Sequence, residues 1–428
     1  MSTELISIVV LGLVFLIGTV RSTNLGALAL VAAFVLGVGV LGLTAPETLA
    51  GFPADLFVIL VGVTYLFAIA KSNGTVDWLV QQSVRAVRGH IAAIPWIMFG
   101  VSFLLVSLGA VSPAAVAIVA PIGMTFAVKY HINPLMMGLM VVHGSAAGNF
   151  SPVGVLGVIT NGVVARSGID ASPTVIYLSN LLFNLLLGVI IYVVFGGLSL
   201  LRERRRAHEI DDLDGDLPAG SGGTAVATRL RLDRDRTLTV AGIAALGIGA
   251  LVFSLDVGLT AMSVAVILTV LSPQRAKGAV AQVSWPTVLL ICGIVTYIGL
   301  MQKIGTVDYL AELIGQTSAP VLAALLVCYI AAIVSAFAST TGILGALIPL
   351  AVPLLAAGQV SAVGLVAALS ISASVVDSSP FSTNGALVVA NAPTERQDSI
   401  YRWLLAWGFG LVLVAPVVTW FAFVVVAG

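Results

Sequence analysis

The sequence predicts an all-α polytopic membrane protein made of two repeats with inverted topology. Three observations support this prediction. The 428 residues are 59% hydrophobic and only 9% charged, which lies far outside the usual composition of a soluble domain. Short motifs recur between the two halves of the chain. The basic residues gather in alternate loops, as they do in a membrane protein of fixed orientation.

Many segments are apolar enough to cross a bilayer, for which roughly 20 mostly apolar residues are needed. The regular segments are 4–20, 24–43, 56–71, 173–198, 237–255, 257–271, 286–301 and 400–426, and four less regular ones are 93–128, 135–165, 321–357 and 361–392. The first segment has no basic leader or small-residue cleavage site, so we expect it to be retained as a helix. Cys292 and Cys328 lie in apolar runs, where packing is a better explanation than a disulfide or a metal site.

The two halves share their motifs at a nearly constant separation. NGTVDWL at 73–79 recurs as IGTVDYL at 304–310, and SPVG at 151–154 corresponds to SPFS at 379–382. We therefore divide the chain into a first membrane repeat at 1–201, a linker at 202–236 and a second membrane repeat at 237–428. The linker has mixed charges with Gly, Ser and Pro at its centre, which is typical of a solvated connection on the cytoplasmic side.

The parity of crossings and the basic residues agree on one orientation. Each half reads as three spans, an interfacial polar stretch, an apolar hairpin, one interrupted segment and a final span. The hairpin returns to its own side, so each half crosses the membrane five times and the halves have opposite orientations. With both termini outside, all of the 19 Lys and Arg residues except Arg166 and Lys303 fall inside. The expected location is the inner membrane of a bacterial cell.

Small and hydroxyl-bearing residues interrupt the apolar segments at four places. The hairpin tips are 109–121 and 337–349, and the helix breaks are 143–154 and 375–389. Asp377 in the second break aligns with Asn149 in the first, at the same separation of 228 residues as Ser151 and Ser379. Broken helices in inverted repeats are typical of secondary transporters, because they leave backbone groups and helix ends free near the midplane.

Asp377 is the one acid that we place near the middle of the membrane. An ionisable residue at that depth is a functional-site hypothesis by default. The alternative is a cap for a half-helix that starts near Ser379, but an ordinary cap does not explain burial at lipid depth, so we favour function. His143 is interpreted as a core histidine bonded to a neighbouring hydroxyl. Ser145 has no third orienting group that would make it a nucleophile.

No Lys or Arg lies in the four interrupted stretches. An anionic substrate would then be held by hydroxyls, side-chain amides, backbone N–H groups and the positive ends of half-helices. Asn149, Asp377 and Asn384, with nearby hydroxyls and carbonyls, are hard ligands for a coupling Na⁺, and a proton on Asp377 is the alternative. The candidate substrate or ion ligands are Ser112, Asn149, Ser151, Gly154, Ser339, Thr340, Thr341, Asp377, Ser379, Ser382, Thr383 and Asn384.

Several of these stretches resemble known carriers. The tip STTGILGALIP resembles the Ser-Asn-Thr hairpin motif of the ion transporter superfamily, which includes the divalent anion:sodium symporters and citrate carriers, and SSPFSTNG resembles the break of their interrupted helices. RSTNLGALALVAAFVLG at 21–37 and HINPLMMGLMVVHGSAAGNFSPVG at 131–154 look like the MatC-type dicarboxylate (malonate) carriers. This resemblance implies an elevator-type carrier, in which hairpins and interrupted helices move on a homodimeric scaffold.

The resemblance also assigns positions within the hairpins. Ser339, Thr340 and Thr341 take the place of Ser-Asn-Thr in the second hairpin. Val111, Ser112 and Pro113 occupy those positions in the first hairpin, where Ser112 alone offers a side-chain ligand. The two hairpins are therefore expected to contribute unequally to the binding of substrate and ion.

We expect a secondary carrier that moves a small dicarboxylate such as malonate or a C4 acid inward with Na⁺ or H⁺, and not an enzyme. The alternative on the same fold is a Na⁺/H⁺ antiporter with no organic substrate. An enzyme using Ser145 or Ser151 with His143 is disfavoured by the matched sites in the two repeats, and a channel by the lack of a ring of filter ligands. The expected partners are the anion, the lipid bilayer and a second copy of the chain. We expect no nucleic acid and no cofactor besides a coupling Na⁺.

Overall fold

The computed structural model describes residues 2–21, 23–85, 91–202, 232–253, 255–306, 309, 320–337, 340–356 and 360–426. Helices and their connections make up this part of the chain, with no strand in it, so the all-α prediction is confirmed there. Most of the predicted linker, residues 203–231, lies outside the described residues, as do Ser339 and Asp308.

The described helices of the first half follow one another from the N-terminus to Arg202. They are α1 Thr3–Arg21, α2 Leu25–Phe34 with a π-helical extension Val35–Val40, α3 Ala45–Thr48, α4 Ala54–Ser72, α5 Thr75–Arg85, α6 Ile94–Ser107, α7 Ser112–Lys129, α8 Pro134–Gly148, α9 Val155–Arg166, α10 Pro173–Val194 and α11 Gly197–Arg202.

The second half begins at α12. Its described helices are α12 Arg234–Val252, α13 Val257–Leu271, α14 Pro273–Ala276, α15 Trp285–Lys303, α17 Pro320–Phe337, α18 Thr340–Leu350, α19 Val352–Ala356, α20 Ala362–Val375, α21 Thr383–Asn391 and α22 Gln397–Trp420, which continues as the π-helical turn Phe421–Val426. Within the described chain, six helical segments are long and apolar enough to cross a membrane, and shorter apolar helices accompany them.

Side-chain caps explain where several of these helices begin. Asn24 accepts hydrogen bonds from the backbone N–H groups of Gly26 and Ala27 at the start of α2 (2.9 and 3.2 Å). The same logic corrects one predicted boundary. Asp233 accepts from the N–H of Arg236 at 2.9 Å, so α12 begins at Arg234, inside the segment that was predicted to be linker as far as 236.

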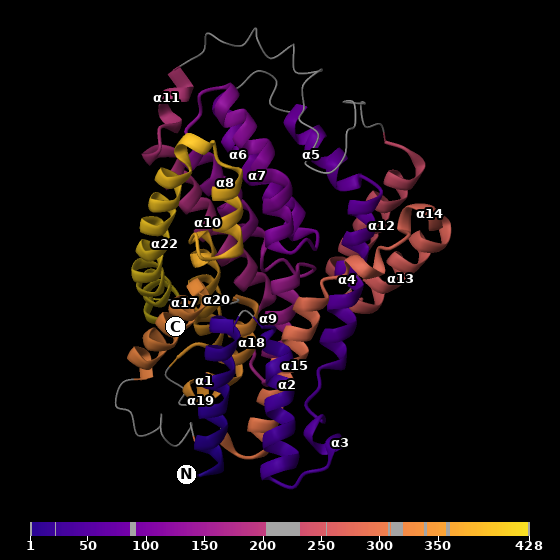
Figure 1. The fold of residues 1–428 in the computed structure, drawn as a ribbon, viewed down its shortest axis with the longest axis vertical. Coiled ribbons are helices and arrows are strands. Elements are labelled where there is room, and N and C mark those ends of the chain that lie inside the picture. The colour runs from indigo at the N-terminus through magenta and orange to yellow at the C-terminus, as the bar shows by residue number, and fades with distance from the viewer. Residues whose placement is uncertain are drawn as a thin grey trace.

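The order of helices is the same in both halves. Helices α4 and α15 have 19 residues each, and they start at Ala54 and Trp285. The hairpin of α6 and α7 has its counterpart in α17 and α18, and the interrupted pair α8 and α9 has its counterpart in α20 and α21. In Figure 1 the α6–α7 hairpin lies in the upper part of the molecule and α17–α18 in the lower part.

Glycine allows the closest helix contacts. A Cβ added to Gly26 of α2 would lie 1.9 Å from the backbone oxygen of Leu289 in α15, and one added to Gly144 of α8 would lie 2.3 Å from that of Phe99 in α6. Small residues of this kind let helix backbones approach each other in a membrane protein. These contacts hold the first interrupted helix against its hairpin, and α15 against α2.

The outer face of α10 is apolar and exposed. Its exposed side chains are Val175, Leu178, Leu182, Leu185, Leu186, Val189, Ile190, Val193 and Val194. On its opposite face, Asn180 and Asn184 are fully buried. An apolar stripe of this length would be unfavourable in water, so it suits a membrane-spanning helix whose polar face is turned to the interior.

Candidate functional site

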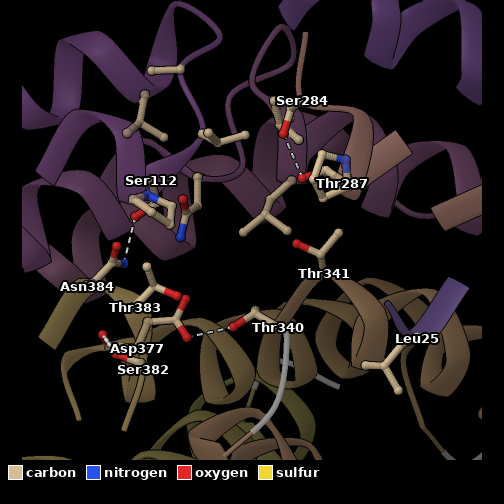
Figure 2. Close-up of a pocket in the computed structure, with 18 of the residues that line it drawn as sticks. Leu25, Ser112, Ser284, Thr287, Thr340, Thr341, Asp377, Ser382, Thr383 and Asn384 are labelled. Atoms are coloured by element: carbon tan, nitrogen blue, oxygen red, sulfur yellow. Dashed lines mark hydrogen bonds between the residues drawn. The ribbon is translucent and has the colours of Figure 1, made fainter. Parts of the chain in front are cut away.

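A cavity of about 790 Å³ lies where the hairpins and the helix breaks meet (Figure 2). Its lining comes from both halves of the chain: Gly18, Thr23, Leu25, Val106, Ala110, Val111, Ser112, Pro113, Asn149, Val155, Leu156, Ser284, Pro286, Thr287, Thr340, Thr341, Asp377, Phe381, Ser382, Thr383 and Asn384. The volume is in the range usual for small-molecule sites. No Lys or Arg is among these lining residues.

The cavity is surrounded by helix N-termini. Of the described hairpin and break helices, α7, α9, α18 and α21 each line it with their first residues, namely Ser112, Val155, Thr340 and Thr383. The first N–H groups of a helix have no partner within that helix, and the N-terminus carries a partial positive charge. The N-caps of α7 and α9, Val111 and Gly154, make no side-chain cap hydrogen bond.

The first break places Asn149 in the wall of the cavity. Asn149 is the C-cap of α8 and is 2% exposed. Ser151 and Gly154, which were also predicted as ligands, are not among the lining residues. The hydroxyl of Ser151 donates to the backbone oxygen of Ser107 at 2.8 Å, and Gly154 is the N-cap of α9. Both residues therefore stabilise the helix break without facing the cavity.

The second break places a carboxylate in the same cavity. Asp377 follows α20, and its Oδ1 accepts a hydrogen bond from the hydroxyl of Thr340 at 2.8 Å (Figure 2). Ser382 is the N-cap of α21, with its hydroxyl accepting from the N–H of Gly385 at 3.2 Å. Ser379 is not a lining residue, and its hydroxyl accepts from the N–H of Phe381 at 3.2 Å. The cap of the half-helix is thus Ser382, and Asp377 is not its cap.

A hydrogen bond between two lining side chains joins the halves of the chain at the cavity. Asn384 Nδ2 donates to the hydroxyl oxygen of Ser112 at 2.8 Å, across 272 residues of sequence (Figure 2). The Ser112 hydroxyl is 2.8 Å from that of Ser145, which donates to the backbone oxygen of Val142 at 2.9 Å. Because the hydroxyl of Ser145 donates its hydrogen bond to the backbone oxygen of Val142, the hydroxyl of Ser112 donates to Ser145 and accepts from Asn384.

Two amide atoms of this site lack hydrogen-bond partners among the described residues. They are Nδ2 of Asn149 and Oδ1 of Asn384, and both atoms are buried. A buried polar atom without a partner costs about 1–3 kcal/mol. Such atoms are few in a folded protein, and these two belong to residues that line the cavity.

The sequence did not single out the wall that faces the second break. Ser284 and Thr287 lie at the start of α15, with their hydroxyl oxygens 2.9 Å apart, and Figure 2 shows them across the cavity from Asp377. The stretch SWPT at 284–287 carries the signal that could have found them, since a Ser before a Pro marks the beginning of a helix. Thr23 is a further hydroxyl-bearing lining residue that the sequence did not single out.

His143 is a buried core histidine, as the sequence suggested, but its partners are different from those expected. Its Nδ1 lies 3.0 Å from Oδ1 of Asn184, and its Nε2 accepts from the indole N–H of Trp407 at 3.0 Å. An amide and an indole, and not a hydroxyl, are therefore bonded to its ring. Ser145 is bonded to Ser112 and Val142, so the pairing of histidine with serine that an enzyme would need is not formed.

Comparisons with known proteins agree with this architecture. Residues 1–149 match the family model for the N-terminus of the dicarboxylate carrier protein MatC. The chain is similar to the crystal structure of the YdaH transporter of Alcanivorax borkumensis, with a TM-score of 0.62 and 18% identity, over 90% of this chain and 88% of that chain. At this identity the likeness shows the fold alone. A search of curated proteins finds no match to the chain.

The matched family and the matched structure are those of transporters and not of enzymes. Helices long enough to span a membrane accompany the match. The resemblance seen in the sequence is therefore confirmed for the first part of the chain: residues 1–149 match the model of the MatC N-terminus, and the chain shares the all-helical fold of a solved transporter.

Proposed function

We propose that this protein is a secondary carrier that moves a small dicarboxylate, malonate or a C4 acid, inward across the bacterial inner membrane with Na⁺ or H⁺. One observation carries the proposal: the N-termini of α7, α9, α18 and α21 converge on a cavity that no Lys or Arg lines. Helix N-termini bind carboxylates through free N–H groups and a favourable dipole. A carboxylate-binding site without fixed positive charge suits a substrate that must also be released.

Hydroxyl and amide side chains supply the remaining contacts to the substrate. Ser112, Thr340, Thr341 and Thr383 line the cavity near these N-termini, and Asn149 offers its amide. Ser339 precedes Thr340 in the sequence of the hairpin tip, and we include it as a candidate substrate ligand for that reason. Ser151, Gly154 and Ser379 act indirectly, because their contacts hold the helix breaks in place. Ser382 lines the cavity and also caps α21.

A coupling cation offsets the negative charge that collects in the cavity. A dicarboxylate and Asp377 together are strongly anionic, and bringing them together at membrane depth is costly unless a positive charge accompanies them. Oxygens of Asp377, Asn149 and Asn384 are the hard ligands that Na⁺ takes at interrupted helices. A proton on Asp377 would serve the same purpose.

The mechanical part of the proposal is an elevator. In it, the hairpins and interrupted helices of two inverted repeats, 1–201 and 237–428, move against a dimeric scaffold, with a cytoplasmic linker at 202–236 and both termini outside. The shared order of helices in the two halves supports the repeats, and the opposite placement of the two hairpins in Figure 1 supports their inversion.

Uptake into proteoliposomes tests the proposal. Purified protein is reconstituted, and uptake of radiolabelled malonate and succinate is measured under an imposed Na⁺ gradient or an imposed pH gradient, with protein-free liposomes as control. We expect uptake above the control under one of the two gradients. No uptake of either acid under either gradient would contradict the proposal.

The variant Asp377→Asn distinguishes the coupling ions. Loss of uptake driven by the pH gradient would identify Asp377 as the proton carrier. Uptake driven by Na⁺ that survives in the variant would leave the ion to Asn149, Asn384 and the hydroxyls. Na⁺ and H⁺ exchange in the absence of any organic acid is the outcome that favours the alternative antiporter, for which the carboxylate of Asp377 in the cavity is the supporting observation.

A further inference from the structure

A chain of buried hydrogen bonds runs from α22 to the end of α8. Its members are Trp407 of α22, His143 of α8, and Asn184 and Asn180 of α10. His143, Asn180 and Asn184 have no exposed surface. None of these four hydrogen-bonded residues lines the cavity. The series nevertheless ends within one helical turn of Asn149, which is a lining residue.

Trp407 determines the direction of this chain. An indole N–H can only donate, and it donates to His143 Nε2 at 3.0 Å. Nε2 therefore carries no proton, and the ring is neutral with its proton on Nδ1. That proton is donated to Oδ1 of Asn184 at 3.0 Å. Both ring nitrogens of His143 are occupied in a single tautomer.

The orientation of His143 also determines how the side-chain amides of Asn184 and Asn180 are oriented. Since Asn184 accepts through Oδ1, its Nδ2 faces Asn180 and donates to the backbone oxygen and to Oδ1 of that residue, each at 3.0 Å. Oδ1 of Asn180 also lies 3.5 Å from the hydroxyl of Ser374. The amide nitrogen of Asn180 is thereby turned toward α8, where it donates to the backbone oxygens of Ala146 (2.8 Å) and Ala147 (3.2 Å).

These two oxygens belong to the carbonyl end of a half-helix. Helix α8 ends at Gly148, so the carbonyl groups of its last turn lack the regular N–H donors of a continuing helix, although the oxygen of Ala146 also accepts from the N–H of Asn149 at 3.1 Å. A half-helix end of this kind is negative and is where transporters hold coupling cations. In the first break the NH₂ group of Asn180 has taken that place.

The second break is built with different groups. At the end of α20 the backbone oxygens of Ala373 and Val375 accept from the hydroxyls of Ser335 (2.7 Å) and Ser378 (3.1 Å). A hydroxyl keeps lone pairs and can turn to bind a cation, whereas an NH₂ group has only donors. Asp377 stands where the first break has Asn149. Of the two breaks, the second is the one equipped for a cation.

We propose that Asn180 takes the place of a coupling cation at the first break, and that His143 and Asn184 are positioning residues that keep its amide turned toward α8. The single coupling ion then binds at the second break, beside Asp377 and Thr340. This inference rests on the proposed function, since the ion in question is the coupling ion. It also gives His143 a role as a neutral, permanently oriented link.

Counting bound sodium tests the inference without any transport. We would measure equilibrium binding of radioactive Na⁺ to the purified full-length protein, and compare wild type with Asn180→Asp. At most one Na⁺ per chain is expected in the wild type. Asn180→Asp is expected to bind one more, because a carboxylate directed at two carbonyl oxygens needs a cation between them.

Asn391→Asp is the matched control. Nδ2 of Asn391 also donates to a helix carbonyl, that of Leu387 at 2.8 Å, but within α21 and away from the cavity lining. The same chemical change there should leave the sodium count as in the wild type. Two sodium ions in the wild type, or no additional one in a monodisperse Asn180→Asp protein, would overturn the inference.

The dependence of uptake on Na⁺ gives a second readout if Asn180→Asp does not fold. A wild-type carrier with one ion site shows a Hill coefficient of about one, and a coefficient near two would overturn the inference. If instead no dicarboxylate is taken up at all, the proposed function fails, while the sodium count on the purified protein still decides whether the first break holds an ion.

Discussion

Asn384 has one amide atom that is hydrogen bonded and one that is not. Its Nδ2 donates to Ser112, while its Oδ1 is buried without a partner in the described part of the chain. The buried Asn180 differs, because both its amide atoms have partners. Two asparagines of similar burial thus differ in the number of amide atoms that the described protein groups satisfy.

This contrast predicts the effects of replacing each asparagine by leucine. In Asn384→Leu the lost hydrogen bond is offset by removal of the unpartnered oxygen, so the free energy of unfolding should change by less than about 1 kcal/mol. In Asn180→Leu the backbone oxygen of Ala147 loses its side-chain donor and that of Ala146 keeps only the N–H of Asn149, so stability should fall by about 2–4 kcal/mol. Dicarboxylate uptake should be lost in both variants.

The two native cysteines make the measurement simple. Cys292 and Cys328 are buried and free, so a thiol-reactive fluorophore reports unfolding during a thermal ramp. The apparent melting temperature of Asn384→Leu should equal that of the wild type, and that of Asn180→Leu should be several degrees lower. An equal fall in both variants would show that the unpartnered oxygen of Asn384 costs the protein nothing.

At the scale of elements, close helix contacts and caps position the site. Helix α15 lines the cavity with its first residues, and its contact with α2 passes through Gly26 and Gly293, where an added Cβ would meet backbone atoms at 1.9 and 2.0 Å. Neither clash can be relieved by turning a side chain. The wall that carries Ser284 and Thr287 therefore depends on two glycines that no binding argument would identify.

Gly26→Ala is expected to destabilise the protein by about 1–3 kcal/mol, because the helices must separate to admit the methyl group. Gly12→Ala in α1 is the control, since nothing lies within 4 Å of a Cβ at that position. The apparent melting temperature should fall in the first variant and stay the same or rise slightly in the second. Equal melting temperatures would mean that α2 and α15 adjust freely.

The Ser382 cap offers a second prediction for an element. Ser382→Ala removes the hydroxyl that accepts from the N–H of Gly385 and donates to the backbone oxygen of Ser379 (2.7 Å). Losing an N-cap costs about 1 kcal/mol, and here it also releases the break beside Asp377. Uptake should fall by about tenfold with little change in melting temperature. An unchanged rate would place the cap outside the working part of the site.

On the scale of the whole molecule, the orientation in the membrane is the main prediction. Both termini are predicted outside and the loop at Lys277 inside. In a background of Cys292→Ala and Cys328→Ala, Ser2→Cys should react with a membrane-impermeant maleimide in intact cells, whereas Lys277→Cys should react only after permeabilisation. Ser2 and Lys277 are both exposed in the fold, so access depends on the side of the membrane. The reverse pattern would invert the proposed topology.

The sequence by itself determined the membrane class, the order of helices and the interrupted stretches. The lengths of the apolar segments and the separations of 228 and 231 residues between matching motifs are visible in the sequence without any knowledge of tertiary contacts. The same signals placed Ser112, Asn149, Thr340, Asp377 and Asn384 among the candidates, and the structure brings all five to one cavity. A helix break within an apolar segment leaves backbone groups without partners at membrane depth, so it usually marks a binding site.

Only the tertiary structure decided which atoms face one another. Nothing local to Asn384 and Ser112 reveals that they meet across 272 residues, or that Asn180 covers the carbonyl end of α8. Ser151, Gly154 and Ser379 carry the same residue types as the lining residues, yet they lie behind the breaks. Residue type and spacing report which groups are available, whereas direction and partner depend on the packing of helices that are distant in sequence.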